Sequence, residues 1–218
     1  MKLKKIASLM LAGIMAVSML AACGEGTGNN NGGASSSEQT GSSSAATVLQ
    51  DKLSGDARRI VKTAAANSNL DAALKNAVDT YFNYSDLYYS IAFDDVLFLK
   101  NDVCDTNNKI NKAVVDAMNA KDSVEKLVDT NNKTTVAVEV YAVNASVSDT
   151  EALEMLAAKI SSYLASRPEK SADVGGSNYD YSYTISASIE TREFDTVGTV
   201  KYGVKYIAVA VTQNVTRV

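Results

Sequence analysis

Residues that interrupt regular structure are scarce through most of this chain. The only proline is Pro168, and no glycine occurs between Gly55 and Gly175. Glycine and proline are the strongest local breakers of helices and strands, so a stretch without them predicts long, uninterrupted elements. The spacing of the apolar residues then indicates the type of each element, because they recur at steps of three and four on a helix face and at every second position on a strand face.

Three helices are predicted between residues 47 and 132. The first covers residues 47–66. The second starts near residue 70 and carries apolar and aromatic residues at steps of three and four, so it either continues to residue 100 or bends around 83–85. The third covers 110–128 and ends at 131–132, where two asparagines tolerate the left-handed conformation of a helix end.

A strand and a fourth helix follow. Residues 134–147 alternate between two faces, with valines at every second position on one of them, which is typical of a strand with a buried side. Ser148 and Glu151 are spaced as a capping box, in which the two side chains satisfy free backbone donors at a helix start. The helix that they begin is expected to end before Pro168, whose ring clashes with a preceding helical residue.

Two further strands are predicted near the C-terminus. Residues 181–190 alternate apolar side chains with the polar ones of Ser182, Thr184, Ser186, Ser188 and Glu190. This polar face is expected to be solvated, unless the N-terminal helices or a partner cover it. If those helices pack elsewhere, an exposed edge of the strand could bind a partner by strand addition. Residues 200–215 form the last strand or pair of strands, with Gly203 as a candidate bulge.

Together these elements predict a single α+β domain from residue 47 to residue 218. About three N-terminal helices (47–132) precede a β-α-β-β unit (133–218) with a small, mainly antiparallel sheet.

The N-terminus has the layout of a secretory signal. Three lysines near the start precede an apolar stretch from residue 6 to residue 20, which is shorter than the ~20 residues that a transmembrane helix needs. Leu20-Ala21-Ala22-Cys23 follows and resembles the lipobox of bacterial lipoproteins. The resemblance covers about the first tenth of the chain. It implies that residues 1–22 are a signal peptide and that Cys23 becomes the acylated N-terminus, carrying diacylglycerol.

The resemblance implies a protein anchored in the lipid bilayer through Cys23, on the outer side of the cytoplasmic membrane. Two acyl chains suffice for stable anchoring, whereas one is marginal. Residues 24–46 consist almost entirely of Gly, Ser, Asn and Thr, and such a segment cannot bury enough apolar surface to fold. Together, 23–46 are interpreted as a lipidated cysteine with a flexible linker, which would span roughly 25 Å on average.

The charge balance disfavours nucleic acid as a partner. The chain has 21 basic and 25 acidic side chains, and loss of residues 1–22 removes three lysines and no acid, which leaves a formal charge of about −7. Nucleic-acid phosphates require a basic face. The sequence also lacks histidine, which excludes Ser-His-Asp and Cys-His catalysis. With Cys23 lipidated, Cys104 is the only free thiol and is expected to be a small buried residue.

No motif for catalysis, metal binding or a cofactor stands out. Asp94 and Asp95 are adjacent on a predicted helix and therefore point apart. The acidic cluster at 102–107 lacks the spacing and the glycine of a calcium loop. Most tyrosines follow the period of their own element and are expected in or near the core. Tyr84 and Tyr179 are the candidates for contact with a ligand or partner, because aromatic rings can stack on sugars or anchor proteins.

The first functional hypothesis is a non-enzymatic lipoprotein that acts as a binding or envelope-associated module. Its expected partner is an envelope protein or a polysaccharide, and no cofactor is expected. One alternative is an exported hydrolase that uses carboxylates, which would need two or more Asp or Glu residues converging in a concave site. Another is a subunit of an envelope complex, which a large apolar patch on the second helix would support.

Overall fold

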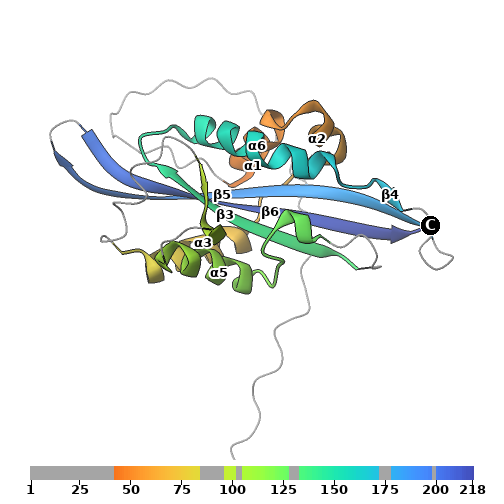
Figure 1. Ribbon diagram of the computed structural model, residues 1–218, viewed down its shortest axis with the longest axis horizontal. Helices are drawn as coiled ribbons and strands as arrows, with labels where there is room; N and C mark the ends of the chain where they lie inside the picture. Colours follow the sequence, from red (N-terminus) through yellow and green to blue (C-terminus); the bar gives the residue numbers. More distant parts are fainter. Residues whose placement is uncertain (1–41, 84–95, 102–104, 128–132, 172–177, 198–199) are drawn as a thin grey trace, which may run out of the picture. The chain divides into compact units, whose positions relative to one another are not determined.

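A computed structural model describes residues 42–83, 96–101, 105–127, 133–171, 178–197 and 200–218 (Figure 1). These residues form a six-stranded mixed sheet with helices on both faces, which confirms the predicted α+β class. Cys23, Tyr84 and Cys104 lie outside the described residues, as do Asp94 and Asp95.

Three long strands make up the centre of the sheet. β5 (Tyr179–Val197) and β6 (Val200–Arg217) form an antiparallel hairpin, and β3 (Thr135–Asn144) pairs with β6 in antiparallel register. Three two-residue strands border them: β1 (Thr63–Ala64), β2 (Leu97–Phe98) and β4 (Lys170–Ser171). The order along the sheet is β1-β5-β6-β3-β2, and β4 also pairs with β5. Only the β1–β5 pairing among these is parallel, so the sheet is mainly antiparallel, as predicted.

Helices cover the two faces of the sheet separately (Figure 1). On one face lie α1 (Ser42–Lys52), α2 (Gly55–Ile60) and α6 (Asp149–Ala165). On the other lie α3 (Ser68–Tyr81) and α5 (Asp105–Ala117). Because the side chains of a strand alternate between faces, the odd residues of β6, such as Ile207, contribute to the first core and the even ones, such as Tyr206, to the second.

The polar face of β5 is only partly solvated. Ser182 is exposed, but Ser186 and Ser188 are buried where α3 packs against β5. They pair with Ala210 and Ala208 of β6, and these small side chains leave room for the helix. The default expectation of a solvated face was therefore wrong for this segment, since an N-terminal helix covers it.

The first predicted helix is two helices, and it starts earlier than expected. α1 begins at Ser42, and Ala45 is fully buried, so the last residues assigned to the linker belong to the fold. The helix breaks at Ser54, whose side chain accepts a hydrogen bond from the backbone N–H of Ala57 at 3.3 Å and caps α2. Residues 63 and 64, which were predicted to lie in the last turn of this helix, instead form β1, because they pair with the distant strand β5.

The second predicted helix does not continue to residue 100. α3 ends at Tyr81, and Phe82, its extended C-cap, packs edge to face on Tyr206. Residues 97–98 form β2, and a 3-10 turn, η2 (Leu99–Asn101), follows them. The periodic pattern was correct for α3, but pairing of residues 97–98 with β3 overrides it further along the chain.

The third predicted helix also ends early. α5 stops at Ala117, and Asn119 has a positive φ of 47°, so the left-handed asparagine lies well before 131–132. Further on, a 3-10 turn, η3 (Val124–Lys126), follows. Val124 therefore joins the core under α6, whereas Val114 of α5 joins the core on the opposite face.

The predictions for the β-α-β-β unit agree best with the structure. α6 buries its predicted apolar stripe and is capped by Ser148, whose side chain accepts a hydrogen bond from the N–H of Glu151 at 3.2 Å. Gly203 is not the bulge, since it pairs in register with Glu193 and the irregularity lies between Phe194 and Val197. Of the helices that the structure describes, none is long and apolar enough to span a membrane.

Candidate functional site

The candidate site is a groove at the edge of the sheet, where two short strands leave part of β5 uncovered. β1 pairs with Thr184 and Ile185, and β4 pairs with Tyr179 and Asp180. The stretch of β5 between them forms the floor of a hollow of about 300 Å³. This volume is at the small end of the range for ligand pockets. We call this hollow the edge groove, lined by Ile60, Lys62, Thr63, Glu169, Lys170 and residues 180–184.

Local interactions explain why both short strands stop at the groove. α2 ends at Ile60, and the carbonyl of its C-cap residue Val61 accepts a hydrogen bond from Gln50 of α1 at 2.9 Å. After β1, Asn67 caps α3 by accepting from the N–H of Leu70 at 3.1 Å, so the chain leaves the sheet edge. On the other side α6 ends before Pro168, and the chain turns into β4.

A buried chain of hydrogen bonds holds the floor in place. The hydroxyl of Tyr183 donates to the carbonyl of Pro168 at 2.9 Å, and Gln213 donates to that hydroxyl at 3.4 Å. Thr135 of β3 in turn donates to the side-chain carbonyl of Gln213 at 3.0 Å. Because Tyr183 and Gln213 are buried, these bonds tie the wall at 168–170 to three strands of the sheet. A site on such a support is positioned by rigid elements.

The mouth of the groove carries basic and acidic side chains in pairs. Glu169 accepts from Arg59 at 2.9 Å and lies 3.5 Å from the ammonium of Lys62. Asp180 and Lys170, partners in the β4–β5 pairing, are 4.0 Å apart. On the floor, the exposed Ser182 and the half-buried Thr184 present hydroxyl groups. The groove can therefore bind a polar, charged ligand with both ion pairs and hydrogen bonds.

The two acidic residues of the groove, Glu169 and Asp180, are each ion-paired with basic neighbours. In the described part of the chain, no three His, Cys, Asp or Glu side chains gather in a way that could hold a metal ion.

Of the two tyrosines proposed for partner contact, the structure describes Tyr179. It is half-buried, packs against the core under α6 and lies next to groove residue Asp180. β5 starts at Tyr179, so this residue continues the apolar stripe of Tyr181 and Tyr183. Its contact with a ligand stays a prediction, as does that of Tyr84.

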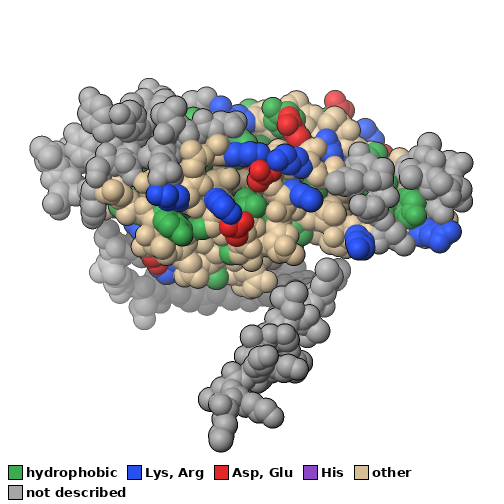
Figure 2. Space-filling model, turned by 60° about the horizontal axis from the view of Figure 1, so that its bottom comes forward, with side chains coloured by type: hydrophobic (Ala, Val, Ile, Leu, Met, Phe, Trp, Pro, Cys, Tyr) green, Lys and Arg blue, Asp and Glu red, His purple; other side chains and the backbone are tan. Residues whose placement is uncertain are grey.

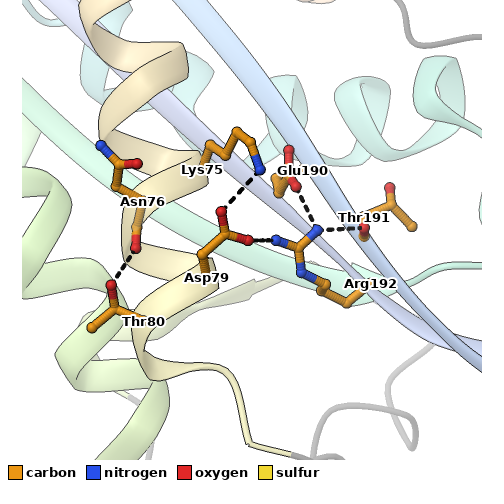
Figure 3. A network of polar contacts seen from close by, with 7 residues as sticks. All are labelled: Lys75, Asn76, Asp79, Thr80, Glu190, Thr191 and Arg192. Carbon is orange, nitrogen blue, oxygen red and sulfur yellow. Dashed lines mark hydrogen bonds and ion pairs between the residues drawn. The ribbon is translucent and has the colours of Figure 1, made fainter.

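A second polar cluster joins α3 to β5 (Figure 3). Arg192 contacts both Asp79 of α3 and Glu190 of its own strand, and Lys75 lies 2.9 Å from Asp79. The hydrogen bond from Lys75, together with the charge of Arg192, lowers the pKa of Asp79. Every charge in this cluster has an opposite charge beside it, so it fastens the helix to the strand and shows no feature of a ligand site.

The buried acid Glu139 is also structural. Its carboxylate accepts hydrogen bonds from the hydroxyl of Ser123 and the N–H of Val124, each at 3.0 Å, and from the hydroxyl of Tyr141 at 2.5 Å. These bonds dock the segment around η3 against β3. With 3% of its surface exposed, Glu139 cannot meet a ligand.

On the face carrying α3 and α5, basic and acidic side chains of the described residues are interspersed (Figure 2). Acidic side chains lie next to basic ones, and uncharged polar side chains and backbone fill much of the surface between them. Exposed pairs such as Lys112–Asp116 of α5 account for this pattern. The edge groove therefore remains the best candidate in the described part of the chain.

Sequence reasoning found only part of the groove. The alternation of β5 identified Ser182 and Thr184 as one polar face, but the charged residues of the mouth follow no motif. Arg59 and Glu169 are 110 positions apart, and only the pairing of β1 and β4 with β5 brings them together. Comparisons of the chain with protein-family models, with curated proteins and with solved structures find no match.

Proposed function

We propose that this protein is a lipid-anchored binding module of the bacterial envelope. The anchor is supported by the N-terminal lysines, the short apolar stretch and the Leu20-Ala21-Ala22-Cys23 motif, which resembles a lipobox. Acylated Cys23 would hold the folded domain on the outer side of the cytoplasmic membrane, and the linker would keep it clear of the bilayer.

The folded domain would hold its ligand in the edge groove. The observation that carries this proposal is a mouth of paired charges above a hydroxyl-bearing floor, built on hydrogen-bonded strands. Ligand sites typically combine a concave shape with a few precisely placed polar groups. The expected ligand is an envelope component, either a polysaccharide or an exposed segment of a protein.

The anchor is tested with Cys23→Ser in the full-length precursor. We expect the wild type to incorporate a radiolabelled fatty acid and to fractionate with membranes, whereas the variant incorporates none and is released or left unprocessed. Ala22→Ser provides a matched control, because a small residue before the cysteine is retained. Fatty-acid labelling of the Cys23→Ser variant would refute lipidation at this residue.

Binding is tested with the chain from Gly24 to Val218, which contains every described residue. We expect isolated envelope material to retain the wild type and to retain Lys62→Ala/Lys170→Ala more weakly, because the double variant loses two cations of the groove. Lys75→Ala/Lys112→Ala removes the same charge from α3 and α5, outside the groove, and should bind as the wild type does. Equal loss in both double variants would show that net charge, not the groove, determines retention.

A further inference from the structure

Two cations share one carboxylate at the mouth of the edge groove. Arg59, at the end of α2, donates to Glu169 at 2.9 Å, and Lys62, just before β1, lies 3.5 Å from the other oxygen of the same carboxylate. Two positive charges thus face one negative charge. The unbalanced positive charge gives this side of the mouth an excess affinity for anions, in a protein whose overall charge is negative.

The cations at and beside the groove are also more exposed to solvent than its carboxylates. The side chains of Lys170, Lys62 and Arg59 are 81%, 73% and 59% exposed, whereas those of Asp180 and Glu169 are 52% and 37% exposed. An approaching ligand therefore meets ammonium and guanidinium groups before it meets carboxylates. This order favours an anionic ligand over a cationic one.

Glu169 can be displaced at small cost. Ion pairs between solvent-exposed side chains contribute little to stability. A phosphate group carries more charge than a carboxylate and offers three strong acceptor oxygens, and guanidinium binds it through two parallel hydrogen bonds. A phosphate can therefore take the place of the Glu169 carboxylate between Arg59 and Lys62.

Residues with uncharged hydroxyl groups also line the hollow. Thr63, Ser182 and Thr184 line the same hollow and carry hydroxyl groups that can both donate and accept hydrogen bonds. Thr63 and Thr184 are direct partners in the β1–β5 pairing, so their side chains lie on the same side of the sheet. Hydroxyl groups of a ligand could form hydrogen bonds with these three side chains. The hollow, with a volume of about 300 Å³, has room for one small polar group of a ligand.

We propose that the edge groove binds a phosphorylated polyol or sugar, with the phosphate between Arg59 and Lys62 in place of Glu169 and the ligand hydroxyls on Thr63, Ser182 and Thr184. This inference rests on the proposed binding function and assigns the ligand class of the same groove. Glu169 then acts as an internal competitor, which occupies the anion position when no ligand is bound.

If Glu169 competes with the ligand for the two cations, removing its charge should strengthen binding, and this increase is the most specific test. Binding of glycerol 3-phosphate to the chain from Gly24 to Val218 is measured by calorimetry in a phosphate-free buffer. We expect Glu169→Gln to bind about 3–10-fold more tightly than the wild type, because removal of the competing charge leaves both cations available. Arg59→Gln/Lys62→Gln should bind at least about tenfold more weakly. Unfolding temperatures verify that each variant is folded.

Two controls separate the site from general charge effects. Glu154→Gln removes an acid from an exposed ion pair between Lys52 of α1 and Glu154 of α6, and it should leave the affinity unchanged. Glycerol without phosphate should not bind measurably. The proposal is overturned if folded Glu169→Gln binds no more tightly than the wild type, or if Glu154→Gln tightens binding to the same extent.

Phosphorylated polyols occur both in soluble polymers and in lipid head groups, so the source is tested in two arms. One arm uses a poly(glycerol phosphate) chain, and the other uses vesicles that contain phosphatidylglycerol. Stronger binding by Glu169→Gln in either arm supports the proposal and identifies the source. Envelope material could also retain the protein in a way that neither glycerol 3-phosphate nor the polymer prevents. That result would overturn the ligand class but leave the binding function intact. The absence of any envelope retention would instead count against the binding function.

Discussion

Arg192 of β5 and Asp79 of α3 form an ion pair across 113 positions of the sequence. The pair joins the helix to the strand that it covers, and Lys75 and Glu190 extend it on either side (Figure 3). α3 therefore packs against β5 both through the buried Ser186 and Ser188 and through a charged contact at its C-terminal end.

Arg192→Gln should destabilise the protein at neutral pH and not in strong acid. The pKa of Asp79 is lowered below its ordinary value of 3.8, first by the hydrogen bond from Lys75 and also by Arg192. Such a group contributes stability above the unfolded-state pKa, and the contribution disappears as the pH falls through the lower folded-state pKa. We expect an unfolding temperature a few degrees below wild type at pH 7 and convergence of the two proteins in acid. Arg58→Gln, an exposed arginine of α2, should have little effect.

Tyr141→Phe should cost about 2 kcal/mol of unfolding free energy, because it removes a buried hydrogen bond to the Glu139 carboxylate. Urea denaturation at pH 7 measures the loss. Tyr163→Phe, at a tyrosine on α6 that is 43% exposed, is the matched control and should be nearly neutral. An equally small effect at both positions would show that the hydrogen bond to Glu139 contributes nothing to stability.

The same tyrosine predicts a response to alkaline pH. Burial, and then the charge of Glu139, raise the pKa of the Tyr141 hydroxyl above its ordinary value of 10.0. The unfolded chain loses this proton near pH 10 while the folded protein keeps it, so the stability falls as the pH rises above 10. Tyr141→Phe should therefore show a shallower loss of unfolding free energy between about pH 10 and 11. Parallel curves for wild type and variant would contradict this assignment.

Asp122 should titrate well below an ordinary aspartate. Hydrogen bonds from Lys126 and then Lys100 lower its pKa from 3.8 to about 2. The ammonium groups lie 2.7 and 2.9 Å from its oxygens and link η3 to η2. Asp122→Asn should lower stability above pH 4 and lose its effect as the pH falls through about 2, because below that pH the Asp122 carboxyl is protonated in both the folded and the unfolded state. NMR titration of the Asp122 carboxyl carbon measures the pKa directly, and a midpoint near 3.8 would contradict the contacts.

Gly203→Ala should destabilise β6 by about 1–3 kcal/mol, through overpacking. A Cβ at this position would lie 2.5 Å from the carbonyl oxygen of Arg192 and 2.9 Å from the Cβ of Ala145. The oxygen belongs to the backbone of the paired strand, so it cannot move aside without breaking the pairing. Gly55→Ala is the matched control: no atom lies within 4 Å of the added methyl, and a change below about 1 kcal/mol is expected.

Elements with strong local signals were predictable. α6 has its own N-cap, an unbroken apolar stripe and a proline beyond its end, so its limits depend on few distant contacts. The long strands β3 and β5 show alternation over enough residues to be recognised. The two-residue strands β1, β2 and β4 could not be predicted, because two residues have no period and their hydrogen bonds depend on partners far along the chain.

The candidate site was also predictable only in part. The hydroxyl floor of the edge groove belongs to the alternating pattern of β5, which the sequence displays directly. The charged residues of the mouth do not belong to that pattern. Arg59 lies in the last turn of α2 and Lys62 between α2 and β1, whereas Glu169 precedes β4 and Lys170 is its first residue. Each of these residues alone is an ordinary exposed charge. They form a candidate site only because the folded structure brings them close together.

By itself, the sequence determined the α+β class, the main strands and α6, and it is the basis for the proposed anchor at Cys23. These properties depend on local spacing, caps and composition, which act between residues that are close along the chain. The tertiary structure decided which helices cover which face of the sheet, where α1, α3 and α5 end, and where the edge groove lies. Those outcomes depend on contacts between segments distant in sequence, such as Arg192 with Asp79 and Arg59 with Glu169, whose partners become neighbours only when the sheet forms.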